Sequence, residues 1–293
     1  MCLLFYDSLH LTEGIFHGIT SSPWGPYALT NGPWDISKTL PESSTALRWM
    51  KKSYDIGSSE TYWWVEMFLS GIAGMNRVME RDVDAPYLTL VTGPPGSMKS
   101  SFCMTMITNH LANQGGFGLY CTVEETVPSL TRATQSLGIR LPPNLQITDF
   151  TELRKDNQNM DYLKFTRKMI EHFKQKEGSN FRVFVLDSLG AIYSLTTVNE
   201  EMRKKMFDFF DFLRTQGLYT FIITERYSGQ QAELEGNEGF LADAILNMGL
   251  DLRNGQIVRT LQVEKMRHIR HSMEKQAIQV GQTGLEIIGP LFD

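Results

Sequence analysis

The stretch from Tyr87 to Ser101, YLTLVTGPPGSMKSS, constrains the fold more than any other part of the 293-residue sequence. Its first five residues are mostly apolar, aromatic or β-branched and predict a buried strand, which breaks at Gly93. Apolar residues then recur at helical spacing after Lys99, namely Phe102, Met106, Ile107 and Leu111. The order strand, glycine-containing loop and helix is typical of a phosphate-binding loop.

This loop has the chemistry that an anion needs, because unpaired backbone N–H groups and the helix dipole meet at a helix N-terminus. Lys99 would contact the β- and γ-phosphates of a nucleotide, and the Ser100 hydroxyl would ligate Mg²⁺. We assign nucleotide binding to Gly93, Pro94, Pro95, Gly96, Ser97, Met98, Lys99, Ser100 and Ser101, together with Arg226.

Met98 stands where the pattern G-x-x-x-x-G-K-[ST] has its second glycine. If the backbone there has a positive φ, a non-glycine residue costs about 1–2 kcal/mol. That is small beside the binding of a nucleotide and its metal, so we interpret Met98 as a variant of the motif. The competing interpretation is a glycine-rich turn that only precedes a core helix.

Buried strands and helices alternate through the middle of the chain. Expected strands lie at 87–91, 118–123, 145–148, 183–186 and 219–224, and expected helices at 99–113, 126–137, 161–175 and around 202–213. This alternation predicts an α/β fold with a mostly parallel central sheet and helices on both faces. From Asp243 onward, strand-like pieces joined by Asn254–Gly255 and by a Gln-Thr-Gly turn predict an antiparallel C-terminal extension.

Charged residues follow four of the predicted strands, and ligands bind at the carboxyl ends of strands in open α/β sheets. These groups are the 93–100 loop, Glu124 with Glu125, Asp187, and Glu225 with Arg226. Glu124 would orient or deprotonate an attacking water, and Asp187 would complete the Mg²⁺ site with Ser100. Two structural interpretations stay open: Glu124 and Glu125 as residues that only cap the next helix, and Asp187 as a turn residue.

Six segments together resemble the KaiC-like branch of the RecA-superfamily P-loop ATPases over roughly Ser70 to Ile288. They are SGIAGMN before the first strand, GPPGSMKSS, YCTVEETVPSL, VFVLDSL, FIITER, and VEKMRHIRHSMEKQAIQVGQTGLEI. The resemblance implies a RecA-like domain that binds and hydrolyses ATP with Mg²⁺. It also implies a homo-oligomer, often a hexameric ring, with ATP between subunits.

In that arrangement Lys265 and Arg267 would reach from one protomer toward the γ-phosphate bound by the next. With Lys99, Glu124 and Glu125 they form our catalytic set. The sequence departs from the family at Met98 and His268, which replace glycines, and at Asn76, which replaces aspartate. Gly239 and Phe240 stand where the cyanobacterial clock protein has phospho-accepting residues, and one ATPase domain is present rather than two, so autokinase and clock functions are not carried over.

Composition predicts two parts of the chain. Residues 1–60 are rich in aromatic residues, Pro and Gly, and we expect them to form an irregular arm, followed by an ATPase domain at 61–293. The arm either docks on the main domain or a neighbouring subunit, or is a flexible tail without a binding surface.

Charge, hydrophobicity and cysteine content limit the partners and the compartment. The net charge of −5 disfavours broad binding to DNA or anionic membranes, and no uninterrupted apolar run is long enough to span a bilayer. Three cysteines without a C-x-x-C pair predict a reducing, cytoplasmic environment. His268 and His271 lack further metal ligands nearby, which argues against zinc.

Three functions therefore compete. The first is an oligomeric regulatory or signalling ATPase whose state is read by an unidentified protein partner. The second is a nucleotide-gated assembly module with little turnover, which Met98 and the aromatic arm favour. The third is a recombinase-like, DNA-dependent ATPase, which the acidic balance and the absence of a basic glycine-rich loop after Arg226 disfavour.

Overall fold

The structure is a computed structural model that describes residues 66–151, 161–194, 200–226 and 238–291. The expectation for the arm at 1–60 lies outside the described residues.

The described strands form a single sheet in the order β3-β2-β4-β5-β1-β6-β7-β8-β9. The six strands from β3 to β6 in this order run parallel to their neighbours. They are β1 (Tyr87–Gly93), β2 (Phe117–Thr122), β3 (Leu145–Asp149), β4 (Phe181–Asp187), β5 (Tyr219–Glu225) and β6 (Ala244–Arg253). Burial of every residue of β1 and β2 explains why these strands read as continuous apolar runs.

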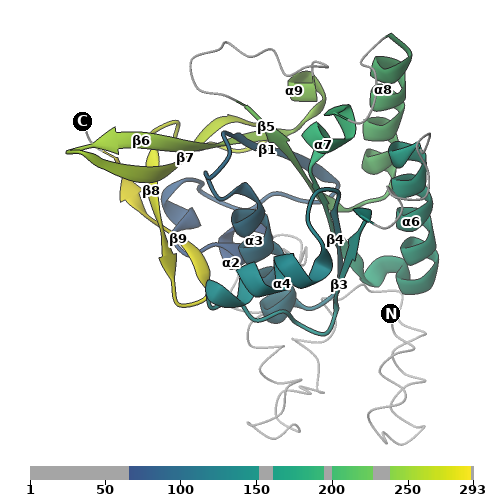
Figure 1. The fold of residues 1–293 in the computed structure, drawn as a ribbon, viewed down its shortest axis with the longest axis horizontal. Coiled ribbons are helices and arrows are strands. Elements are labelled where there is room, and N and C mark those ends of the chain that lie inside the picture. The colour runs from purple at the N-terminus through teal and green to yellow at the C-terminus, as the bar shows by residue number, and fades with distance from the viewer. Residues whose placement is uncertain (1–65, 152–160, 195–199, 227–237, 292–293) are drawn as a thin grey trace, which may run out of the picture. The chain divides into compact units, whose positions relative to one another are not determined.

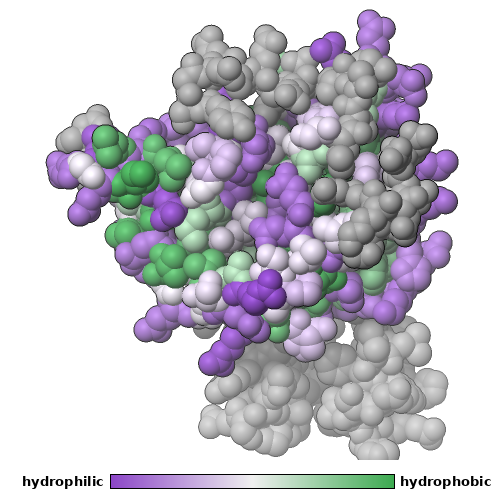
Figure 2. Space-filling model, in the orientation of Figure 1, coloured by the Kyte–Doolittle hydropathy of each residue, from purple (hydrophilic) through white to green (hydrophobic). Residues whose placement is uncertain are grey.

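The C-terminal part adds an antiparallel extension to this sheet through β7 (Gln256–Met266), β8 (Gln276–Gly281) and β9 (Gly284–Pro290). Strands β6 and β7 form a hairpin that projects from the body of the sheet (Figure 1). Its turn holds Asn254 at φ 49° and Gly255 at φ 77°, the positive values that a tight hairpin turn requires. Leu252 and Ile257 flank the turn and are exposed, so the projecting hairpin carries hydrophobic surface (Figure 2).

Helices cover both faces of the parallel part (Figure 1). One face carries α2 (Phe68–Gly71), α3 (Lys99–Gln114) and α4 (Val127–Ser136), and the other carries α6 (Tyr162–Glu177), α7 (Leu189–Ser194) and α8 (Glu200–Thr215). Shorter elements are η4 (Met75–Arg77), η5 (Gly178–Asn180) and α9 (Glu238–Leu241). No helix in these described stretches is long and apolar enough to cross a bilayer.

Local sequence explains where several helices begin. The Thr126 hydroxyl accepts a hydrogen bond from the Ser129 backbone N–H at 3.4 Å and caps α4. The Asp161 carboxylate accepts one from the Lys164 N–H at 3.0 Å and caps α6. Helix α3 begins after Met98, in the left-handed region at φ 71°, and ends at Gly115.

Alternating side chains of the central strands build two cores, one on each face. In β4, Val183 and Val185 join the core under α3, whereas Phe184 and Leu186 join the core under α6 and α8. The α/β fold with a mostly parallel sheet and an antiparallel C-terminal extension is therefore confirmed.

Candidate nucleotide-binding site

Four neighbouring strands bring the expected polar groups to one edge of the sheet. Strands β2, β4, β5 and β1 are adjacent and parallel, so their carboxyl ends lie side by side. Thr122 pairs with Asp187, and Gly93 pairs with Glu225, which sets the two acidic strand ends level with the loop. This topology brings the predicted groups to one edge of the sheet, where ligands of open α/β sheets bind.

A hydrogen bond within the loop between β1 and α3 holds the loop in a turn. The Ser97 hydroxyl donates to the Pro94 carbonyl at 2.8 Å. Met98 follows at φ 71° and ψ 33°, so the position expected to hold glycine has the backbone conformation that favours glycine. Gly93 is required for space, since a Cβ there would lie 2.1 Å from the Met248 carbonyl oxygen. Arg259 of β7, which the sequence did not single out, donates its Nε–H to the Gly96 carbonyl at 3.2 Å.

Lys99 is buried at the start of α3, with 8% of its surface exposed. Its ammonium donates to the carbonyl oxygens of Gly93 at 2.9 Å and Pro94 at 3.0 Å. Burial lowers the pKa of Lys99, and the negative charges of Glu225 and Asp187 oppose that shift. The ammonium therefore lies within the loop that would surround phosphates, close to acidic groups from two other strand ends.

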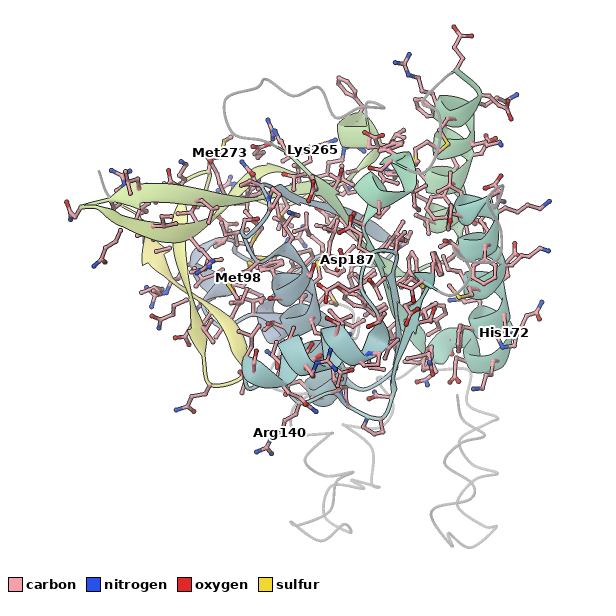
Figure 3. The ribbon with its side chains drawn as sticks, in the orientation of Figure 1. Met98, Arg140, His172, Asp187, Lys265 and Met273 are labelled. Atoms are coloured by element: carbon pink, nitrogen blue, oxygen red, sulfur yellow. The ribbon has the colours of Figure 1, made fainter. Side chains whose placement is uncertain are left out.

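Asp187 ends β4 beside the first turn of α3, and Figure 3 places Met98 and Asp187 on either side of that helix. The Tyr120 hydroxyl donates to Asp187 Oδ2 at 2.6 Å, and the Ser100 side chain lies near the same carboxyl group. Burial raises the pKa of Asp187, while the neighbouring Tyr120 and Ser100 hydroxyls lower it. A hydroxyl and a carboxylate form a set of hard oxygen donors, which fits Mg²⁺. The turn interpretation also has a basis, since Ser188 Oγ accepts a hydrogen bond from the Ala191 N–H at 3.1 Å after a cis Asp187–Ser188 peptide bond.

The structure separates the roles of Glu124 and Glu125. Glu124 Oε1 accepts a hydrogen bond from the Ser188 hydroxyl at 3.2 Å, so this carboxylate faces the end of β4. Glu125 Oε2 instead accepts one from the Ser129 hydroxyl at 3.0 Å, inside the first turn of α4. Glu125 thus contacts the start of α4, whose cap is Thr126, whereas Glu124 faces the strand ends.

Glu225 ends β5, and Arg226 follows it. Arg226 Nη1 forms an ion pair with Glu264 Oε2 of β7 at 2.6 Å, and Asn247 of β6 donates to the other oxygen of that carboxylate at 2.9 Å. The Arg226 backbone N–H donates to the Gly93 carbonyl at 3.1 Å. Arg226 therefore borders the loop, with its guanidinium turned to β7.

Lys265 and Arg267 lie near α9 within the same chain, and Lys265 is labelled beside that helix in Figure 3. Lys265 Nζ donates to the carbonyls of Gly239 at 2.8 Å and Ala242 at 2.7 Å. Arg267 Nη1 lies 3.3 Å from Asp243 Oδ1. Burial lowers the pKa of Lys265, and the neighbouring Arg267 charge adds to that effect. These cations are held by backbone oxygens and by one buried carboxylate.

The two other departures from the family pattern also have a structural setting. His268 has φ 72°, so here too a family glycine position keeps a positive φ without glycine. Asn76 lines a shallow pocket of about 220 Å³ with Arg77, Arg270 and His271 among its other lining residues.

Sequence reasoning missed Tyr120, Ser188, Arg259 and Glu264. Tyr120, Ser188 and Glu264 lie within three of the six segments named in the sequence analysis, but nothing in the sequence distinguishes their side chains there, and Arg259 lies outside those segments. Only their contacts with Asp187, Glu124, Gly96 and Arg226 identify them.

Comparison with known proteins agrees with this geometry. A family model described as "ATPase: KaiC" matches residues 68–291. The chain belongs to the KaiC family of ATPases. This KaiC-family chain is 28% identical over 142 residues to the DNA repair and recombination protein RadB of Methanobrevibacter smithii, a match that covers 46% of the chain and 57% of RadB. It is 25% identical over 236 residues to a UPF0273 protein of Thermotoga maritima, which covers 74% of the chain and 94% of that protein.

Among solved structures, a KaiC-like protein from the archaeon Pyrococcus horikoshii OT3 superposes with a TM-score of 0.62. The two are 24% identical, and the match covers 74% of this chain and 96% of the other. The likeness shows that the KaiC-family fold is shared.

Proposed function

We propose that this KaiC-family protein hydrolyses ATP to ADP and phosphate, and that copies of the chain assemble with the nucleotide between them. The observation that carries the proposal is the convergence of Lys99, Asp187 and Glu124 on one sheet edge, with Ser100 beside Asp187. Each group has a separate part in phosphoryl transfer to water, and the parts come from different strands.

In the proposed reaction, the loop N–H groups and Lys99 bind the β- and γ-phosphates. Lys99 would exchange its hydrogen bonds with Gly93 and Pro94 for phosphate oxygens, because those carbonyls lie in the same loop. Ser100 and Asp187 would hold Mg²⁺, which neutralises charge on the phosphate oxygens when bound.

Glu124 would accept a proton from the water that attacks the γ-phosphorus, while the bond from that phosphorus to the ADP oxygen breaks. Its hydrogen bond from Ser188 would hold the carboxylate at the end of β4. Glu125 is our matched comparison, since it has the same side chain one residue later but turns to Ser129.

The test is phosphate release from ATP with Mg²⁺ by wild type, Glu124→Gln and Glu125→Gln. A general base contributes about 10²–10⁴-fold, so Glu124→Gln should lose at least that much turnover while binding ATP nearly as well. Glu125→Gln should stay within about 10-fold of wild type, because the Glu125 carboxylate contacts the Ser129 hydroxyl at the start of α4 and so is directed away from the attacking water. Equal turnover in wild type and Glu124→Gln would refute the assignment of Glu124.

The proposed assembly, with a hexameric ring as the expected arrangement, places Lys265 and Arg267 of one copy beside the nucleotide of the next. Their position at α9 supports this, since both cations lie outside the set formed by Lys99, Asp187 and Glu124 of their own chain. Mixing Lys265→Ala with Glu124→Gln subunits tests it. About a quarter of the junctions in mixed rings would combine two intact halves, so two inactive proteins should regain activity on mixing. If subunit exchange is verified and the mixture still shows no ATPase activity, Lys265 does not act on the nucleotide bound by the neighbouring copy.

Two other functions have an observation in their favour. A nucleotide-gated assembly module with little turnover is favoured by the left-handed Met98 beside the phosphate loop, and it predicts ATP-dependent assembly without phosphate release. A DNA-dependent ATPase is favoured by the similarity to RadB over about half of that protein's length. It predicts that single-stranded DNA binds with a strong salt dependence and stimulates turnover. The partner that reads the ATP state in the regulatory model is a protein of unspecified identity, and co-purification with and without ATP would identify it.

A further inference from the structure

We propose that Tyr120 is a positioning residue for the metal site: its buried hydroxyl holds the Asp187 carboxylate in place against Ser100. This inference rests on the proposed function, because it assigns to Tyr120 a task toward the Mg²⁺ that the proposed reaction uses.

The first observation is the contact itself. Tyr120 is fully buried in β2, and its hydroxyl donates to Asp187 Oδ2 at 2.6 Å, from the strand adjacent to β4. A hydrogen bond to a charged carboxylate at this distance is stronger and more directional than one between neutral groups. The contact therefore fixes one oxygen of Asp187 and leaves the other for a second partner.

The second observation is that Ser100 belongs to the same group. From the first turn of α3, its side chain lies close enough to both groups to lower the pKa of Asp187 and of Tyr120. Cys103, one turn further along α3, is also buried near Asp187. The two oxygen ligands expected for Mg²⁺ thus both lie beside one buried phenol.

The third observation is a contrast with another buried tyrosine of the same core. Tyr219 of β5 donates its hydroxyl to the Val83 backbone carbonyl at 2.8 Å, a contact that only satisfies the hydroxyl. Tyr120 reaches a side chain that is free to rotate, and so its hydrogen bond selects an orientation. Partners that orient metal ligands typically change metal affinity by about 10–100-fold.

The test compares Tyr120→Phe with Tyr219→Phe in the full-length protein. Each change removes one buried hydroxyl from the same core, so both should lower the denaturation midpoint by a similar amount. The readouts are Mn²⁺ affinity in the presence of a non-hydrolysable ATP analogue, from the electron paramagnetic resonance of free Mn²⁺, and affinity for that analogue in EDTA.

We expect Tyr120→Phe to bind Mn²⁺ about 10-fold or more weakly, with affinity for the nucleotide in EDTA unchanged, and Tyr219→Phe to match wild type in both. In an Asp187→Asn background, adding Tyr120→Phe should weaken Mn²⁺ binding no further, because the group that it orients is no longer a carboxylate. A 4-aminophenylalanine at position 120 keeps an N–H donor at the same place and should restore Mn²⁺ affinity, which also serves if Tyr120→Phe does not fold.

Unchanged Mn²⁺ affinity in Tyr120→Phe, or equal weakening in Tyr219→Phe, would overturn this inference alone. A wild-type protein that binds neither the ATP analogue nor Mn²⁺ would overturn the proposed function and this inference with it.

Discussion

Met98 offers a direct measurement of backbone strain in the phosphate-binding loop. It holds φ 71° at the start of α3, and its half-buried side chain packs against the core under that helix. Glycine would relieve about 1–2 kcal/mol of left-handed strain. It would also lose about 1 kcal/mol of side-chain burial and about 0.5–1 kcal/mol through the larger entropy of the unfolded chain. Met98→Gly should therefore stay within about 1 kcal/mol of wild type.

The informative comparison is between Met98→Ala and Met98→Gly. Both lose the packing of the methionine side chain, but only glycine relieves the strain. Met98→Gly should thus be more stable than Met98→Ala by about 0.5–1 kcal/mol. Ala112, which is exposed within α3, serves as a control at which glycine should be less stable than alanine. Ala112→Gly should lower the free energy of unfolding by about 1 kcal/mol.

Urea unfolding without nucleotide measures these differences, with the slope against denaturant required to stay constant. A change of 1 kcal/mol corresponds to about 2–4 °C in the melting temperature of a domain of this size. If Met98→Gly is less stable than Met98→Ala by the amount measured at position 112, the left-handed backbone at Met98 carries no strain and the reasoning fails.

Two further predictions concern close packing and buried thiols. Gly74→Ala should destabilise the fold by about 2–4 kcal/mol in urea unfolding, since a Cβ there would lie 2.2 Å from the Ile287 carbonyl oxygen. Gly217→Ala, at φ 67° with open space around it, should lose no more than about 1 kcal/mol, and equal losses would exclude the steric explanation. Burial raises the pKa of the Cys103 and Cys121 thiols, so in a Cys2→Ser variant iodoacetamide should label neither at pH 8 until urea is added. Because these are acids with raised folded-state pKa values, their contribution to stability should fall as the pH rises above about 8.5, and labelling of the native protein would contradict the assigned burial.

The sheet edge could be predicted from the sequence because each strand and loop there has a recognisable pattern within a short stretch of residues. An apolar run that ends in an acid predicts a buried strand with a charged end, and this holds for β4 ending at Asp187 and for β5 ending at Glu225. Alternation with helices then makes the strands parallel, which brings their carboxyl ends together. The periodicity of hydrophobic residues and one topological rule were therefore sufficient to predict the strands and the meeting of their carboxyl ends.

The contacts between side chains at that edge could not be predicted in the same way. Tyr120 meets Asp187 across 67 positions of sequence, and Arg226 meets Glu264 across 38. A tyrosine in a buried strand looks the same whether its hydroxyl reaches a backbone carbonyl, as Tyr219 does, or a carboxylate. Strand register and helix placement decide between these, and both depend on the assembled core.

The two replaced glycines show how the assembled fold overrides local preference. Met98 and His268 occupy positions at which the family has glycine, and both keep a positive φ. At His268, hydrogen bonds fix the chain on both sides of the residue: Arg81 donates to the His268 carbonyl at 3.2 Å, and the Tyr87 hydroxyl donates to the Arg267 carbonyl at 3.1 Å.

These contacts come from residues far away in the sequence, so they are retained when the local residue changes. The positive φ therefore persists in the folded protein, which is destabilised by the strain of about 1–2 kcal/mol. His268→Gly should therefore stabilise the fold by up to about 1 kcal/mol in urea unfolding, after the entropy of glycine is deducted. In His268→Ala the strain remains, so that variant should be no more stable than wild type. A His268→Gly protein less stable than His268→Ala would show that the turn adopts a positive φ without cost, and that the glycine of the family serves close approach of another chain rather than backbone conformation.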